Sequence, residues 1–294
     1  MSSRKEKLMS LAGIDFTNKT DVGIRNLFKR VLNNGMHGLC FSAYVEGQNP
    51  GDQLNEDQIR RRMKVIQPYT KWIRSFSCID GNEHIPRIAH EYGIKTMVGA
   101  WLGDDPEVNK KEVQGLIELA NEGCVDIAAV GNEVLLRGDL SEDELLGFIN
   151  QVKEAIPDIP VGYVDAYYEF TQHPRIVDAS DVILANCYPF WEGCSLEYSL
   201  VYMKQMYHQA IDAARGKKVI ISETGWPNIG TSFQGANPSF INAMKYFINT
   251  QVWSDTEDVE IFYFSSFDES WKVGAEGDVG AYWGIWDKDE KLKY

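Results

Sequence analysis

The feature that most constrains this chain is an alternation between short apolar runs and longer amphipathic stretches, which continues almost from end to end. The apolar runs are HGLCFSAYV, WIRSFS, IKTMVGAW, VDIAAVGNE, VGYVDAY, VILANCYPF, KVIISET and VEIFYFSSF. Stretches such as NEDQIRRRMKVIQPY and SEDELLGFINQVKEAI lie between them and repeat apolar residues with the period of a helix. This alternation is typical of a parallel sheet that helices cover.

The number and spacing of the predicted strands favour a closed barrel. An open doubly wound sheet can also hold eight strands, so the count alone leaves both arrangements open. The near-regular spacing and the absence of a Pro- or Ser-rich linker indicate one continuous series of strand–helix units. We therefore predict an α/β fold with a single domain over residues 1–294, a (β/α)8 TIM barrel. Residues 1–36, which include TDVGIRNLFKRVLNNG, are predicted to form an N-terminal helical extension before the first strand.

Charge and hydrophobicity limit the class of ligand. The net charge of −14 and the pI near 4.8 argue against nucleic acid, polyanionic substrates and acidic membrane surfaces, so a neutral ligand is the simplest prediction. No apolar run reaches the roughly 18 residues that a membrane span needs. The first residues, MSSRKEKLMSLAG, lack the apolar stretch of a secretory signal. This predicts a cytoplasmic location, unless the chain is trimmed from a secreted precursor.

The cysteines and histidines do not form a recognisable metal or disulfide pattern. The five cysteines have no C-x-x-C spacing, and we expect free thiols that are mostly buried. His84 and His90 are six residues apart and do not share a helix face. The glycine-rich segment GAEGDVGAYWG follows the last strand, but no strong helix follows it, which disfavours a phosphate loop. We expect neither a metal nor a cofactor.

Polar and aromatic residues gather where the predicted strands end. Because the carboxyl ends of barrel strands converge on one mouth, these side chains should meet there. They are Ser42, Tyr44, Arg74, Ser77, Trp101, Asn132, Glu133, Asp165, Tyr167, Asn186, Tyr188, Phe190, Trp191, Glu223, Trp226, Asp268, Glu269, Trp271 and Lys272. Aromatic rings stack on the C–H faces of sugars, and paired carboxylates cleave glycosidic bonds. The two candidate catalytic carboxylates are Glu133 and Glu223.

Plainer explanations exist for each of these residues taken alone. Glu133 could cap the following turn, Glu223 could pair with a lysine, and Trp226 could pack within its loop. The joint occurrence of VGNE and SETGWP at two predicted strand ends favours the catalytic interpretation. Two other classes stay open: a non-catalytic carbohydrate-binding barrel, in which the carboxylates accept sugar hydroxyls, and an isomerase or aldolase barrel. The latter is disfavoured because no phosphate loop and no lysine within an apolar strand is evident.

Four motifs resemble glycoside hydrolase family 17, the retaining β-1,3-glucanases and β-1,3-glucan transglycosylases. They are AVGNEV (129–134), CYPFW (187–191), ISETGWP (221–227) and FDESWK (267–272), and YWGIWD (282–287) is a weaker match. The forms of the second and fourth motifs are closer to fungal and bacterial members than to the plant enzymes.

The resemblance implies roles for individual residues. Glu133 is similar to the general acid/base of the family and Glu223 to its nucleophile. Asn132 is similar to the residue that hydrogen-bonds the sugar 2-hydroxyl, and Tyr188 to the tyrosine that steadies the nucleophile. Glu269 and Lys272 are similar to a charged pair at the edge of the site. We expect further substrate contacts from Tyr44, Arg74, Asp165, Phe190, Trp191, Trp226 and Trp271.

The function that the resemblance implies is retaining hydrolysis of a laminarin-type β-1,3-glucan by double displacement. A β-1,3-glucanosyltransferase, in which transfer to a sugar dominates over hydrolysis, is the alternative. The expected partner is therefore a neutral β-glucan or oligosaccharide, with no nucleic acid and no membrane. We expect the protein to be a monomer.

Overall fold

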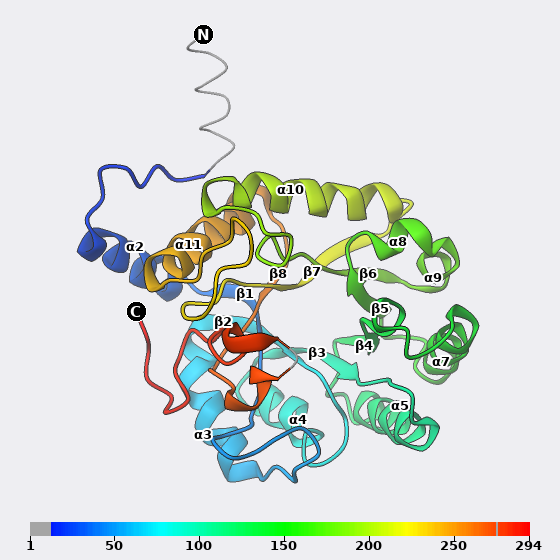
Figure 1. Ribbon diagram of the computed structural model, residues 1–294. Coiled ribbons are helices and arrows are strands. Elements are labelled where there is room, and N and C mark those ends of the chain that lie inside the picture. The colour runs from blue at the N-terminus through cyan, green and yellow to red at the C-terminus, as the bar shows by residue number, and fades with distance from the viewer. Residues whose placement is uncertain (1–12, 275) are drawn as a thin grey trace.

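Eight parallel strands pair in chain order and close into a barrel, because β8 pairs with both β7 and β1 (Figure 1). The computed structural model describes residues 13–274 and 276–294. The strands are β1 Met36–Cys40, β2 Thr70–Ser75, β3 Lys95–Ala100, β4 Ile127–Asn132, β5 Val161–Ala166, β6 Val182–Asn186, β7 Lys218–Thr224 and β8 Ile261–Tyr263. Each overlaps one of the apolar runs of the sequence, and β1 and β2 begin one and two residues before theirs. The predicted (β/α)8 TIM barrel is confirmed.

Helices surround the barrel and connect successive strands (Figure 1). The longer ones are α2 Asp21–Asn33, α3 Glu56–Ile66, α4 His84–Glu91, α5 Pro106–Asn121, α7 Glu142–Ala155, α10 Leu196–Ala213 and α11 Phe240–Glu257. Shorter segments are α6 Val134–Arg137, α8 Glu169–Gln172, α9 Pro174–Ala179, η1 Gln67–Tyr69, η2 Ser270–Val273 and η3 Gly277–Val279.

Local sequence signals set the helix ends. The Asp105 side chain accepts hydrogen bonds from the first turn of α5, and Ser141 and Glu144 form a reciprocal capping box at the start of α7. Gly93 and Gly123 follow α4 and α5 with φ angles of 71° and 80°, a left-handed conformation that ends a helix at little cost for glycine. These caps satisfy the end groups that would otherwise lack partners.

Helix α2 belongs to the ring of helices and is not an appendage to it. It packs beside α11, and the Phe28 ring lies 4.7 Å from that of Phe247 and 4.8 Å from that of Tyr294, centroid to centroid. No α-helix follows β8 in residues 264–274 and 276–294, so α2 contributes a helix from before the first strand. The predicted helix is thus present over 21–33. Residues 1–12 of the predicted extension lie outside the described part of the chain.

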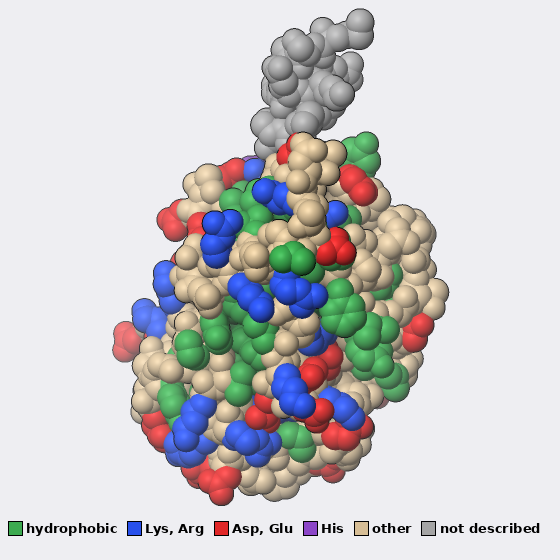
Figure 2. All heavy atoms as spheres, turned by 90° about the vertical axis from the view of Figure 1, so that its left-hand side faces the viewer, with side chains coloured by type: hydrophobic (Ala, Val, Ile, Leu, Met, Phe, Trp, Pro, Cys, Tyr) green, Lys and Arg blue, Asp and Glu red, His purple; other side chains and the backbone are tan. Residues whose placement is uncertain are grey.

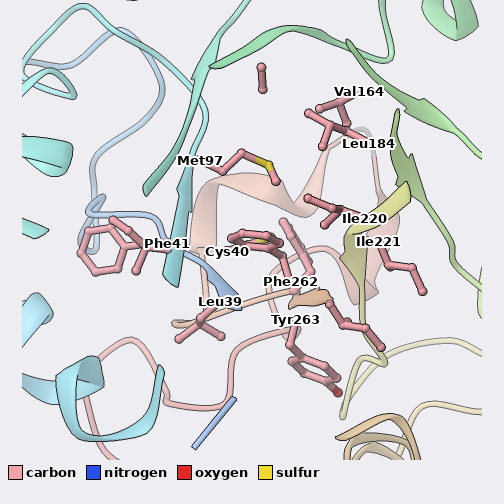
Figure 3. Packing of buried hydrophobic residues seen from close by; sticks show 14 of the residues in the cluster. Leu39, Cys40, Phe41, Met97, Val164, Leu184, Ile220, Ile221, Phe262 and Tyr263 are labelled. Atoms are coloured by element: carbon pink, nitrogen blue, oxygen red, sulfur yellow. The ribbon is translucent and has the colours of Figure 1, made fainter. Parts of the chain in front are cut away.

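One hydrophobic core fills the barrel and the space beneath the helices. Figure 3 shows part of it, with buried side chains from β1, β3, β5, β6, β7 and β8 in a single cluster. Gly38 of β1 is required by this packing, because an added Cβ would lie 2.5 Å from the Phe262 ring. The barrel is therefore a packed scaffold that holds the strand ends in place.

The structure shows how the charged side chains are distributed on one face and in what state the cysteines are. Figure 2 shows acidic and basic side chains interspersed on the face that it presents. In the described residues, helices are too short or too polar to cross a membrane. All five cysteines are free, and Cys40, Cys78 and Cys187 are buried, which confirms the expectation of mostly buried thiols.

Candidate active site

Irregular strand pairing marks the carboxyl end of the barrel. The register shifts between β4 and β5 near Asn132, between β6 and β7 near Asn186, and between β7 and β8 near Thr224. Such irregularities redirect side chains at barrel rims. Here they occur beside both candidate catalytic carboxylates, Glu133 after β4 and Glu223 in β7.

Glu223 is buried and held by a cation and a hydroxyl. The Arg74 guanidinium of β2 donates a short charge-assisted hydrogen bond to Glu223 Oε1. The Tyr188 hydroxyl donates to Glu223 Oε2 at 2.7 Å. These contacts fix the orientation of both carboxylate oxygens, which suits a group that attacks.

Glu133 occupies a different environment and an unusual backbone conformation. Its φ is 52°, and its N–H donates to the Val164 carbonyl at 2.8 Å. The Asn186 amide donates to Glu133 Oε1 at 2.8 Å. Burial raises the pKa of the Glu133 carboxyl to about 7, and the nearby Glu223 charge adds to this increase. A carboxyl group with such a pKa can carry a proton near neutral pH, as a general acid must.

A hydrogen-bond network joins the two carboxylates to the strand ends. Arg74 Nη2 donates to Asn132 Oδ1 at 2.7 Å, so one guanidinium holds both Glu223 and the residue before Glu133. On the other side, the Ser222 hydroxyl donates to Asn186 Oδ1 at 2.9 Å, which orients the Asn186 amide toward Glu133. The side chains of β2, β4, β6 and β7 therefore form one connected site.

A second charged group lies beyond β8. Lys272 Nζ lies 3.0 Å from Glu269 Oε2, and the Trp271 indole donates to Glu269 Oε1 at 3.2 Å. Burial disfavours the Lys272 charge, but the carboxylates of Glu269 and Glu276 raise the pKa of Lys272 overall. The ammonium also lies 4.0 Å from the Phe264 ring centroid. The predicted pair of Glu269 and Lys272 forms, and Glu276 joins it.

Aromatic side chains surround parts of the mouth. Trp191 after β6 is 37% exposed, and its ring lies 6.2 Å from that of Phe233 in the loop after β7. The half-buried Tyr44 and Trp271 rings meet edge to face at 6.3 Å, after β1 and β8. These exposed or half-buried rings offer apolar faces to a ligand.

Two aromatic residues that were expected to contact substrate are buried instead. Trp226 is only 1% exposed, and its indole N–H donates to the Asn237 carbonyl at 3.0 Å. Phe190 is fully buried against the Trp226 ring at 5.3 Å. Both belong to the packing beneath the mouth, because their rings fill the space between the loops after β6 and β7.

Two polar residues of the expected substrate-binding set are also engaged inside the protein. Asp165 is buried, accepts a hydrogen bond from the Tyr163 hydroxyl, and accepts another from the Ala166 N–H at 2.7 Å. Arg74 is buried and directed to Glu223 and Asn132. The polar groups of both residues face protein partners, and their direct contact with substrate stays a prediction.

Several residues of the site in the structure are absent from the set predicted to bind substrate. The sequence marks Asn186 and Trp101 only as residues at strand ends, because their contacts form only in three dimensions. Arg137, Phe233 and Glu276 lie in segments after the strands, where no periodic pattern marks them. In residues 13–274 and 276–294, no three His, Cys, Asp or Glu side chains gather in a way that could hold a metal ion.

The chain is similar to known glycoside hydrolases over most of its length. Residues 38–284 match the family model described as the BtgE/BtgC glycoside hydrolase domain. A "Glucan 1,3-beta-glucosidase" of Saccharomyces cerevisiae is 27% identical over 87% of this chain and 90% of its own length. One of Arthroderma benhamiae with the same description is 30% identical over 87% and 89%.

Solved structures are similar over the same extent. A family 17 β-1,3-glucanosyltransferase of Rhizomucor miehei has a TM-score of 0.79 and 29% identity, covering 89% of this chain and 96% of that one. An endo-laminarinase of Formosa, at 18% identity and a TM-score of 0.73, covers 89% of this chain and 86% of its own and shares the fold.

Proposed function

The chain belongs to the BtgE/BtgC glycoside hydrolase family, and on that premise we propose that it cleaves the β-1,3 linkages of a neutral glucan by a retaining mechanism. It is a glycosidase, and the four motifs that resemble family 17 agree with its structural similarity to a family 17 enzyme. The substrate class is carried over from relatives whose descriptions name 1,3-β-glucan.

The observation that carries the mechanism is the contrast between the two carboxylates. Both oxygens of Glu223 are held, one by the Arg74 guanidinium and one by the Tyr188 hydroxyl. The carboxyl group of Glu133 has its pKa raised to about 7 by burial and by the Glu223 charge, which favours the protonated form. One group is thus suited to attack carbon and the other to donate a proton.

In the first step, the Glu223 carboxylate attacks the anomeric carbon and the bond to the leaving oxygen breaks. Glu133 gives its proton to that oxygen, and a covalent glucosyl–Glu223 ester remains. The ester removes the negative charge of Glu223, so the pKa of Glu133 falls and the group becomes a base. Glu133 then takes a proton from water or from a sugar hydroxyl, whose oxygen attacks the same carbon and releases Glu223.

Water as the acceptor gives hydrolysis, which we propose as the main outcome. Transfer to a second sugar is the other candidate, because the similar Rhizomucor miehei structure is that of a β-1,3-glucanosyltransferase. Trp191 and Phe233 offer apolar rings at the rim on which an acceptor sugar could stack. The ratio of the two products depends on how well such a sugar competes with water.

The test is the activity and stereochemistry of wild-type protein and of two variants on laminarin. Wild-type protein should release reducing sugar, and NMR of the first product should show the β-anomer. Glu223→Gln should lose more than about 1,000-fold in kcat while keeping its melting temperature and glucan binding. An initial α-anomer would contradict the retaining mechanism, and an active Glu223→Gln would mean that another group attacks. Chromatography for products longer than the substrate measures transfer.

A further inference from the structure

Trp101 is exposed at the mouth, and no step of the mechanism uses it. It follows β3 directly and is 40% exposed, whereas the neighbouring Leu102 is fully buried. A tryptophan that only serves packing is expected to resemble Trp226, which is 1% exposed. Exposure of such a large apolar ring beside a binding site points to contact with a ligand.

The Trp101 ring is held by a cation that is itself fixed. The Arg137 guanidinium carbon lies 4.8 Å from the ring centroid. Arg137 Nε donates to Asp139 at 2.7 Å and Arg137 Nη2 donates to the Leu102 carbonyl at 3.0 Å. These bonds fix the plane of the guanidinium, so the indole that stacks on it has little freedom to rotate.

The Trp101 backbone is held from the other side by Glu112 of α5. This buried carboxylate accepts hydrogen bonds from the Ser77 hydroxyl at 2.6 Å and from the Cys78 N–H at 2.7 Å. The Trp101 backbone N–H also faces this carboxyl group and counteracts the effect of burial on its pKa. One carboxylate therefore fastens the segments after β2 and β3 together.

The same arginine connects Trp101 to the catalytic strand. Arg137 Nη1 donates to the carbonyl of Asn132, the residue directly before Glu133. The Arg137 guanidinium therefore contacts both the Trp101 ring and the backbone next to Glu133, and holds them in a fixed relative position. A ligand seated on the ring would keep a fixed position relative to the proton donor.

We propose that Trp101, with Arg137 and Glu112 as positioning residues, forms a sugar-binding subsite for a glucosyl unit other than the one that Glu223 attacks. This inference rests on the proposed function, since the occupant is a unit of the same glucan. A neutral sugar offers C–H faces and hydroxyls but no charge, so a flat apolar ring is a suitable surface for it. A ring that is already ordered loses little conformational entropy when the sugar binds.

A subsite beyond the one that holds the attacked unit predicts an effect that grows with chain length. Trp101→Ala should raise KM for laminarihexaose about 3- to 10-fold, the usual effect of losing one stacked ring, and leave kcat unchanged. The change with laminaritriose should be smaller than about 2-fold, because fewer of its units reach the subsite. Trp101→Phe, which keeps an aromatic ring, should have a KM for laminarihexaose close to that of wild-type protein. Tyr198→Ala, which removes a 68% exposed aromatic ring from α10, is the matched control and should change neither value.

Glu112→Ala tests the positioning role separately. It should reproduce the loss for the hexaose alone, and Glu112→Gln, which keeps an acceptor oxygen, should lose less. Equal losses on both substrates, or unchanged KM for the hexaose in Trp101→Ala, would overturn the subsite.

Calorimetry distinguishes a failure of the proposed subsite from a failure of the proposed function. Laminarihexaose is titrated into Glu223→Gln and into the same variant with Trp101→Ala. A wild-type protein without activity on either oligosaccharide would contradict the function, while weaker hexaose binding in the double variant would still support the subsite. Equal binding by both variants would overturn it.

Discussion

Glu133 combines a left-handed backbone with a buried carboxyl group. A φ of 52° is disfavoured for a side chain with a Cβ, and it persists here because both neighbouring peptide groups are held. In the peptide group before it, the Glu133 N–H donates to the Val164 carbonyl and the Asn132 carbonyl accepts from the Arg137 side chain. In the peptide group after it, the Glu133 carbonyl accepts from the Arg137 N–H at 2.9 Å. The local strain directs the carboxyl toward Asn186 and the Glu223 charge, and this position gives Glu133 its raised pKa.

The pH dependence of activity should report this group. If Glu133 must be protonated to donate, kcat/KM should fall as pH rises through about 7, the pKa to which burial and Glu223 raise it. Asp165 also raises this pKa, so Asp165→Asn should move the fall in activity to lower pH. A pH profile of both proteins on laminarin checks this. An alkaline limb that stays in place in the variant would mean that another group controls it.

The free energy of unfolding should depend less on pH in Glu133→Gln than in wild-type protein, because the variant cannot ionise at this position. A carboxyl group whose folded pKa is raised is favourable when protonated, and that contribution is lost as pH rises from about 4.5 through about 7. Glu133→Gln cannot ionise, so it should unfold less readily than wild-type protein at pH 8, by up to about 3 kcal/mol. At pH 4 the difference should be small. Thermal melts at the two pH values measure it, and a variant that is less stable at pH 8 would contradict the expectation.

At the scale of elements, the site depends on how closely β7 and β8 approach at their carboxyl ends. Gly225 follows β7, two residues after Glu223, and an added Cβ would lie 2.1 Å from the Phe264 carbonyl. Neither backbone can yield without displacing the residues beside it. The close approach therefore fixes the position of the nucleophile relative to the segment after β8.

Gly225→Ala should lower kcat by about 10- to 100-fold, because a shift of about 1 Å in a reacting group has effects of this size. The matched control is Gly147→Ala in α7, where no atom lies within 4 Å of the added Cβ. This control should keep full activity and gain up to about 1 kcal/mol in stability from helix propensity. Steady-state kinetics and melts of both variants make the comparison. Full activity in Gly225→Ala would show that β7 and β8 can separate without harm.

Helix α2 provides a second prediction at this scale. Phe28 is buried between Phe247 of α11 and the C-terminal Tyr294, so Phe28→Ala should reduce the free energy of unfolding by about 3–5 kcal/mol. Val22→Ala on the same helix is the control, since Val22 is 67% exposed and should have little effect. Denaturant unfolding measures both. A small effect at Phe28 would mean that α2 is only loosely attached to the ring.

For the whole molecule, we expect the net charge to have little effect on the rate at which a neutral glucan is bound and cleaved. The net charge is −14, but acidic and basic side chains are interspersed on the face in Figure 2. A neutral glucan has no charge for the overall field to attract or repel. Its kcat/KM should therefore change less than about 2-fold when salt is raised from about 0.05 to 0.5 M, although this range shortens the Debye length severalfold. A steep salt dependence on laminarin would indicate a charged substrate instead.

Local sequence patterns were enough to predict the architecture and the catalytic candidates. Strand and helix periods are local properties, and the strand order follows from them because parallel neighbours in a barrel are consecutive in the chain. Glu133 and Glu223 could be predicted because each follows an apolar run within a recognisable motif. The pairing of Glu269 with Lys272 was implied by the resemblance of the FDESWK motif to family 17.

Which side chains face the mouth and which are enclosed depends on how the loops pack in three dimensions. Trp226 and Trp191 each follow a predicted strand, yet the first is buried and the second exposed, because loops from different strands cover one and not the other. The Arg74 contact with Glu223 joins residues 149 positions apart, and the Arg137 contact with Trp101 depends on the path of a loop. Burial and long-range contacts of this kind also set the pKa of Glu133. They arise from the assembled fold, which periodicity and motif spacing do not encode.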